Sequence, residues 1–136
     1  MTQYPRVPRG LPMPAVPALH STGDVYCAIT TVDGSGRLAD RSAVRVLGWE
    51  PGDRFDIAVH AGGARAVSTD VGRLRVAANG HLRLPSPTRH LLGIACGDRV
   101  LVVAKSEQNA LLVYSMATVT NLLTQFEAPD NASVSP

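Results

Sequence analysis

The sequence predicts a mainly β protein in which two tandem copies of one small unit are followed by an amphipathic helix. Three observations predict it: a repeated pattern, apolar residues that alternate along short segments, and turn residues between those segments. The pattern reads Gly-basic-Leu, then Leu-Gly-apolar-x-x-Gly-Asp-Arg-apolar, and then an apolar run. Gly48 and Gly93 are 45 residues apart, as are Gly52 and Gly97. A fixed period of this length indicates two copies of one supersecondary unit.

The N-terminal segment, residues 1–23, is expected to form a disordered arm because its five prolines oppose regular structure. The prolines also interrupt the continuous apolar core that a secretory signal requires. No apolar run elsewhere approaches the roughly 20 residues needed to cross a bilayer. These features predict a protein without a membrane segment that works in the cytoplasm.

The first copy of the unit spans residues 24–69. It has Gly36-Arg37-Leu38 in its front half and Gly52-Asp53 ahead of an apolar run. A glycine followed by an aspartate is typical of a tight turn that leads into a strand. Trp49 occupies the position that Ile94 has in the second copy, so we expect Trp49 to pack in the core.

The second copy spans residues 70–114. Residues 76–84 indicate two short strands joined by an Asn-Gly hairpin turn. The second of these strands sorts its residues by face, with Leu82 and Leu84 on one side and His81 and Arg83 on the other. Each unit therefore reads β-β-short α-β-β.

The back half of the second copy contains a short helix and two strands. Ser86 is expected to cap the helix with Pro87 at its first position, and Gly93 is expected to end it. A turn then leads into a strand over residues 99–105, and a second turn returns the chain into residues 110–114.

A C-terminal amphipathic helix is predicted over residues 115–126, with Ser115 as its cap. Its apolar residues follow helical spacing and are Met116, Val119, Leu122, Leu123 and Phe126. Such a helix must cover the β domain or a second chain, and we expect it to join two chains as a homodimer. Residues 127–136 read as a disordered polar tail.

The second copy carries, in order, Gly80-His81-Leu82, Pro85, Arg89, Leu92-Gly93-Ile94 and Gly97-Asp98. This series resembles the core of the AbrB/SpoVT/MazE-type DNA-binding domains. The first copy keeps the glycines and Arg45, but it has Asp40-Arg41 where the family places an apolar residue and proline. The resemblance implies a swapped-hairpin β-barrel, in which two units interlock; here both units belong to one chain.

The charge of the chain is unevenly distributed. The whole sequence carries a formal net charge of only +2. Residues 24–69 hold five arginines and six acidic residues, a net charge of −1, whereas residues 70–117 hold six basic and three acidic residues, a net charge of +3. The second copy therefore carries the basic footprint that nucleic-acid binding requires.

The family contacts DNA through arginines on its first hairpin and at the start of the helical segment. The resemblance transfers DNA contacts to Arg73, Arg75, His81, Arg83, Arg89 and His90 in the second copy, and to Arg37, Arg41 and Arg45 in the first. His81 stands where the family usually has arginine, which implies a contact that is weak or dependent on pH.

An enzyme is not expected. Cys27 and Cys96 lack the spacing of zinc ligands and are expected to be buried or inert thiols. The histidines show no metal spacing, and no serine-hydrolase, P-loop or paired-carboxylate motif occurs. We expect no cofactor.

Two functions remain open from the sequence. The first is a bacterial transcriptional regulator, associated with the nucleoid, that binds double-stranded DNA with a preference for certain sequences. The second is an antitoxin-like or scaffold protein that uses the barrel and the C-terminal helix to bind a protein partner. The basic second copy favours DNA, and the more acidic first copy favours a protein partner or a structural role for that half.

Overall fold

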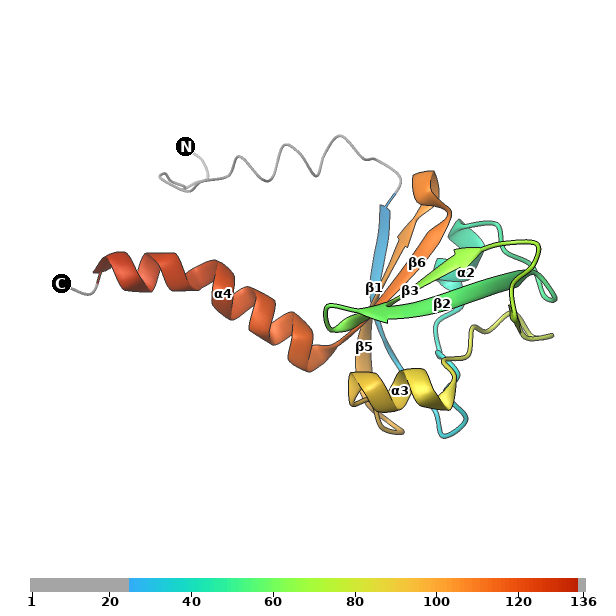
Figure 1. Ribbon diagram of the computed structural model, residues 1–136, viewed down its shortest axis with the longest axis horizontal. Helices are drawn as coiled ribbons and strands as arrows, with labels where there is room; N and C mark the ends of the chain where they lie inside the picture. Colours follow the sequence, from blue (N-terminus) through green and yellow to red (C-terminus); the bar gives the residue numbers. More distant parts are fainter. Residues whose placement is uncertain (1–24, 135–136) are drawn as a thin grey trace.

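The computed structural model describes residues 25–134, with side chains described as far as Glu127. The Pro-rich arm expected over residues 1–23 lies outside this range. The chain is mainly β, as predicted, and its six strands form one antiparallel sheet in the order β1-β5-β6-β3-β2-β4 (Figure 1). The elements are β1 (Val25–Thr31), α2 (Ser42–Val46), β2 (Arg54–His60), β3 (Gly63–Ser68), β4 (Leu74–Arg75), α3 (Ser86–Leu92), β5 (Arg99–Lys105), the 3-10 turn η1 (Ser106–Gln108), β6 (Ala110–Ser115) and α4 (Met116–Val134).

Strands from the two halves of the chain complete one another. β1 pairs with β5, and β4 pairs with β2. The hairpins β2–β3 and β5–β6 meet through the pairing of β3 with β6. Near one edge, the N–H of Leu38 donates to the carbonyl of Leu82 at 2.9 Å, and that of Leu84 donates to the carbonyl of Gly36 at 2.8 Å. Neither half therefore forms a separate sheet.

The glycines of the repeat adopt matching left-handed conformations. Their φ angles are 90° and 86° at Gly36 and Gly80, 75° and 69° at Gly48 and Gly93, and 91° and 87° at Gly52 and Gly97. Hydrogen bonds match as well, because the N–H of Gly52 donates to Val76 O at 2.9 Å and that of Gly97 donates to Val32 O at 2.7 Å. The repeated glycines thus occupy repeated backbone positions.

The core gathers buried apolar side chains from the sheet and from the segments that connect its strands. Leu82 and Leu84 are fully buried, as their alternation with His81 and Arg83 predicts. Trp49 and Ile94 are each 7% exposed, which confirms that Trp49 packs in the core. Its ring stacks on Phe55 with the centroids 5.9 Å apart, and its Nε1 donates to Asn109 Oδ1 at 2.8 Å.

The predicted hairpin at residues 76–84 is only partly formed. The Asn-Gly turn is present, because the N–H of Ala77 donates to the carbonyl of His81 at 3.0 Å. The flanking strands are shorter than expected: β4 ends at Arg75, and Arg83 makes an isolated bridge with Arg37. The backbone of Leu82 accepts a hydrogen bond from Leu38, and that of Leu84 donates one to Gly36. These residues therefore pair with the first half of the chain and do not extend the local hairpin.

The short helix α3 begins one residue earlier than expected. Pro85 is its N-cap, Ser86 is its first residue, and no side chain caps it, so the prediction that Ser86 caps this helix is wrong. The preceding Pro85, with φ −59° and ψ 152°, already directs the chain into the helix. Gly93 ends the helix in the left-handed conformation, as predicted.

Helix α4 follows β6 directly and is longer than predicted. Ser115 Oγ accepts the N–H of Thr118 at 3.2 Å, which confirms the cap. Thr118 Oγ1 donates to the carbonyl of Gly62 at 3.0 Å and so ties the first turn to the β2–β3 turn. The helix then continues to Val134, through residues that were expected to form a tail. Adding residues to an existing helix costs less free energy than starting a new helix. The polar composition of residues 127–136 did not indicate this extension.

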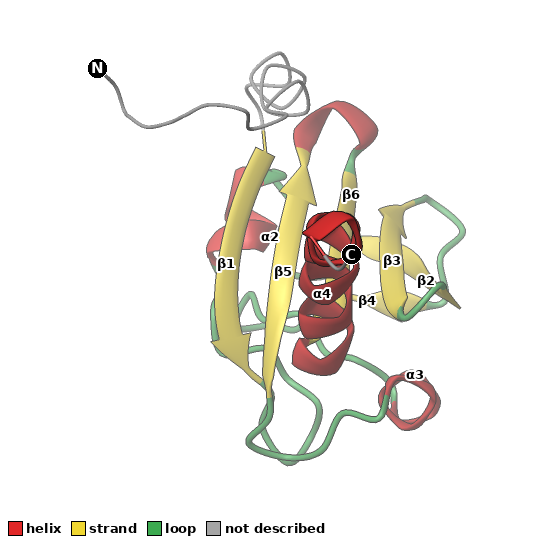
Figure 2. Cartoon of the chain, turned by 90° about the vertical axis from the view of Figure 1, so that its left-hand side faces the viewer, coloured by secondary structure: helices red, strands yellow, loops and turns green. Residues whose placement is uncertain are grey.

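Figure 2 shows α4 nearly end-on, in front of the strands β5 and β6 that it contacts. None of the helices in residues 25–134 combines the length and hydropathy needed to cross a bilayer.

Candidate nucleic-acid interface

Two pairs of arginines face each other across neighbouring strands. Arg54 on β2 is directly opposite Arg75 on β4, and Arg37 is directly opposite Arg83. Directly opposite residues of antiparallel strands share one face, with Cβ atoms about 5 Å apart, and like charges there destabilise the sheet. An anion that binds between them relieves this repulsion.

Arg75 and Arg83 also meet Arg89 around one cavity. Its volume is about 510 Å³, and its polar lining includes the hydroxyl residues Ser35 and Ser86 but no carboxylate. The cavity is therefore suited to anions, because three arginines line it and no acidic residue does.

Arg89 is held in place by both halves of the chain. Its Nε donates to the carbonyl of Leu84 at 3.0 Å. A Cβ added at Gly36 would lie 2.7 Å from this Nε and even closer to the carbonyl oxygen of Leu84. Glycine at position 36, with φ at +90°, therefore leaves the space that Arg89 occupies.

Arg37 differs from Arg54, Arg75 and Arg83 because its side chain forms an ion pair with an acidic residue. Its Nε lies 3.0 Å from Asp33 Oδ2, the one ion pair among the side chains of residues 25–127. The N–H of Arg37 and the hydroxyl of Ser35 donate to Asp33, and these hydrogen bonds hold the pKa of its carboxyl well below the usual range. Arg37 is thus anchored next to Arg83 and contributes less free charge.

A second cavity of about 500 Å³ lies beside α2. Arg41 and Arg45 line it together with Glu50 and Trp49. Arg41 Nη1 donates to the carbonyl of Asn79 at 3.0 Å. This cavity is less basic than the first, because it has two arginines and a carboxylate.

Four of the predicted DNA contacts line neither of these cavities: Arg37, described above, and Arg73, His81 and His90. Arg73 lines a separate hollow beside Asp56, whose Oδ1 accepts the N–H of Arg73 at 2.9 Å. His90 is exposed on α3 and does not line the first cavity. His81 is half-buried, and its Nδ1 lies 2.7 Å from the carbonyl oxygen of Leu38.

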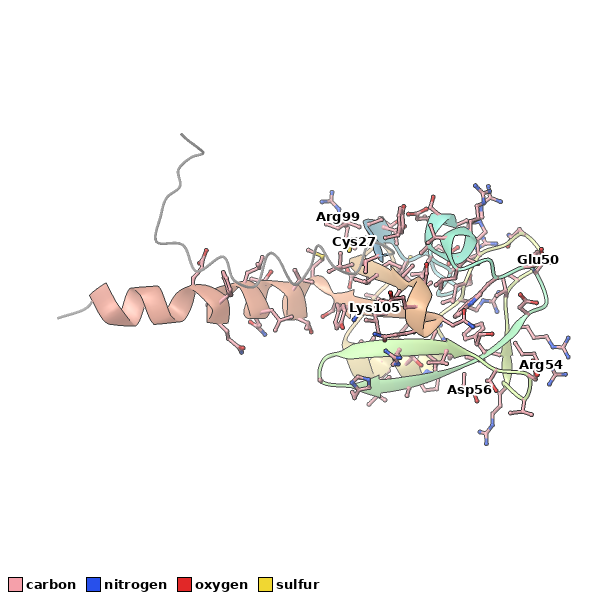
Figure 3. The ribbon with its side chains drawn as sticks, turned by 90° about the horizontal axis from the view of Figure 1, so that it is seen from above. Cys27, Glu50, Arg54, Asp56, Arg99 and Lys105 are labelled. Carbon is pink, nitrogen blue, oxygen red and sulfur yellow. The ribbon has the colours of Figure 1, made fainter. Side chains whose placement is uncertain are left out.

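Sequence reasoning missed Arg54. Figure 3 shows Arg54 at the end of the molecule that lies away from α4. It directly follows the Gly52-Asp53 turn, which marks the start of β2 in the sequence. Its partner Arg75 lies in the other half of the chain, and no local pattern indicates that the two side chains are paired.

The two cysteines were expected to be buried or inert thiols; both are free and exposed, so they are not buried. Cys27 lies on the outward side of the edge strand β1, where alternate residues are exposed (Figure 3). Cys96 lies in the turn before β5, where Gly97 and Asp98 are also exposed. Within the described range, no group of His, Cys, Asp and Glu side chains is arranged to hold a metal ion.

The aspartates of the repeat stabilise its turns, as expected. Asp53 Oδ2 accepts the N–H of Glu50, and Asp98 Oδ2 accepts that of Ala95, each at 2.8 Å. They are therefore committed to turn formation.

Comparisons of this chain with models of protein families, with curated proteins and with solved structures returned no match.

Proposed function

We propose that this protein binds duplex DNA with a preference for certain sequences and acts as a transcriptional regulator. One observation carries the proposal: Arg75, Arg83 and Arg89 converge on a single open cavity without a carboxylate. Arginine suits this role because its planar fork can bind a phosphate, or the O6 and N7 atoms of guanine, through two hydrogen bonds.

The extent of the basic surface favours a polyanion over a small ligand. Arg54 and Arg37 flank the first cavity through their strand pairs with Arg75 and Arg83. The second cavity adds Arg41 and Arg45 from α2. Several separate cationic groups match the repeated phosphates of a nucleic-acid backbone better than they match one small anion.

We also propose that the two halves are AbrB-like units interlocked as a swapped-hairpin barrel. Three findings support this reading: each half supplies a strand to the other, residues 36–38 pair with residues 82–84, and the repeated glycines have matching φ angles.

The proposal is tested by fluorescence anisotropy with labelled duplexes. Arg83→Ala and Arg89→Ala should each weaken binding by about 5- to 150-fold, for a contact of roughly 1–3 kcal/mol. Arg65→Ala is the matched control, because Arg65 lies on β3 and donates to Gln108 Oε1 at 3.0 Å, away from both cavities. Unchanged binding in the Arg83 and Arg89 variants would contradict the proposal.

A second function, the protein-interaction module, is favoured by α4. Leu122, Leu123 and Phe126 on this helix are 54%, 60% and 70% exposed, and no described residue covers them. Apolar side chains grouped in this way mark interaction surfaces. We propose that α4 joins two chains as a homodimer, and an antitoxin-like or scaffold role is the alternative.

Sedimentation velocity separates these readings. Leu123→Asp with Phe126→Asp should convert a dimer to a monomer, whereas Asn121→Asp, on the opposite side of the same helix, should not. A wild-type protein that sediments as a monomer would remove the homodimer and leave the apolar face to a different partner.

A further inference from the structure

The two cavities share three corresponding positions, and different parts of the two halves line the rest of each cavity. Each lies beside the arginine of a short helix, Arg89 of α3 or Arg45 of α2. The N–H of Arg89 donates to Pro85 O at 3.0 Å, and that of Arg45 donates to Arg41 O at 3.1 Å, so the two arginines hold matching positions.

The opposite wall of each cavity comes from the other half of the chain. Ser35, which precedes Gly36, lines the first cavity, and Asn79, which precedes Gly80, lines the second. Figure 1 shows the two short helices apart from each other, with α2 above β2 and α3 below it in this view. The molecule thus presents two similar sites within one chain.

The chemistry of the two sites differs. The first has Arg75, Arg83 and Arg89 and no acid. The positions 44 residues before Arg75 and Arg83 hold Thr31 and Ala39, so two of its three arginines have no counterpart in the first half. The first cavity is therefore equipped for strong anion contacts that the second cannot make.

The second site has its own distinct features. Glu50 lies in it where the other half has Ala95, and Arg41 already donates to Asn79 O. A carboxylate repels phosphate but accepts a hydrogen bond from the amino group of cytosine. We therefore expect fewer DNA contacts at the second cavity, and we expect them to depend less on the charge of the DNA phosphates.

From these differences we infer that one chain recognises a duplex whose two halves are unlike. The inference rests on the proposed DNA binding and deepens it. One half of the duplex lies against Arg75, Arg83 and Arg89, and the other lies against Arg41 and Arg45. The chain consequently binds its preferred site in a single orientation, although the repeated glycines of its two halves have matching conformations.

Cys96 offers a direct readout of orientation. It is exposed, and its Sγ lies 3.7 Å from the position of a Cβ on Gly34, in the turn that carries Ser35. In a Cys27→Ser variant, an iron–EDTA cleavage reagent attached to Cys96 would mark the side of the first cavity. The duplex is one selected from a random pool. The protein also carries Leu123→Asp and Phe126→Asp, so that it binds at one chain per duplex, as checked by sedimentation.

The expected result is cleavage confined to one half of the selected duplex. Ethylation interference, which needs no label, should show strong phosphate contacts in that half. Arg83→Ala should weaken the contacts there only, and Arg45→Ala should weaken them only in the other half.

Equal cleavage and equal interference in both halves of the one-to-one complex would overturn the inference and leave DNA binding intact. Failure to select any duplex over random sequence would overturn the proposed function, and this inference with it.

Discussion

Gly36, in the first half of the chain, leaves room for the side chain of Arg89, in the second half. A side chain at position 36 would meet both Leu84 O and the guanidinium of Arg89, and it would also strain a φ of +90°. The site therefore depends on a glycine that lies far from Arg89 in sequence.

We predict that Gly36→Ala lowers both stability and DNA affinity. The left-handed backbone alone costs about 1–2 kcal/mol, and displacement of Arg89 adds to that cost. Gly93→Ala is the control, because its φ is +69° but nothing lies within 4 Å of the added Cβ. Urea unfolding should show a smaller loss for Gly93→Ala, and anisotropy should show a change for Gly36→Ala alone. Equal effects of the two variants on DNA affinity would contradict the role of Gly36.

Asp33 is expected to make the stability of the folded protein decrease at low pH. Hydrogen bonds from the backbone of Arg37 and from Ser35 lower its pKa in the folded protein. Its contribution to stability is therefore complete above the unfolded pKa, near pH 4, and is lost as the pH falls towards the folded pKa. Between about pH 4 and pH 2, the urea midpoint of the wild type should fall more steeply than that of Asp33→Asn. Parallel curves would show that Asp33 does not contribute.

At the scale of the elements, the pairing of β2 with β4 places Arg54 directly opposite Arg75. Relief of this repulsion should stabilise the free protein by about 0.2–1 kcal/mol at low salt. We predict that Arg75→Gln raises the urea midpoint while it weakens DNA binding.

Arg54→Gln should give a similar gain in stability, and the double variant should gain little more, since both changes remove one repulsion. Two independent and fully additive gains would show that the side chains do not interact. A loss of stability in Arg75→Gln would contradict the repulsion itself.

Local patterns predicted the elements that depend on local order. The strand over residues 99–105 follows from an apolar run after a Gly-Asp turn, and the burial of Leu82 and Leu84 follows from alternation. The helix end at Gly93 follows from the need for a left-handed residue. The pairs Arg54–Arg75 and Arg37–Arg83 could not be predicted, because each joins segments from different halves. The uneven charge of the sequence therefore predicted a basic surface in the second half, but it did not predict which arginines lie opposite one another.

At the scale of the whole molecule, two surfaces of different chemistry lie far apart. α4 projects from one end, and Arg54 lies at the other (Figure 3). The helix is anchored through Thr118 and Gly62, and every described residue beyond Val119 is exposed. Self-association and DNA binding can therefore be separated.

We predict that a chain ending after Val119 keeps its folded sheet, sediments as a monomer and still binds DNA, with lower affinity. The root of α4 remains in this variant, so its melting temperature should stay within a few degrees of the wild type at equal concentration. An unfolded truncated chain would show that the outer part of α4 supports the core.

The most direct test of the DNA-binding surface is a salt titration of duplex binding by the wild type and by Arg75→Ala/Arg83→Ala/Arg89→Ala. Each phosphate contact contributes about 0.9 to the slope of log K against log salt. We predict that the triple variant binds more weakly and that its slope is smaller by about 2 to 3, while Arg65→Ala keeps the wild-type slope. Equal slopes for the wild type and the triple variant, or no duplex binding by the wild type, would contradict the account.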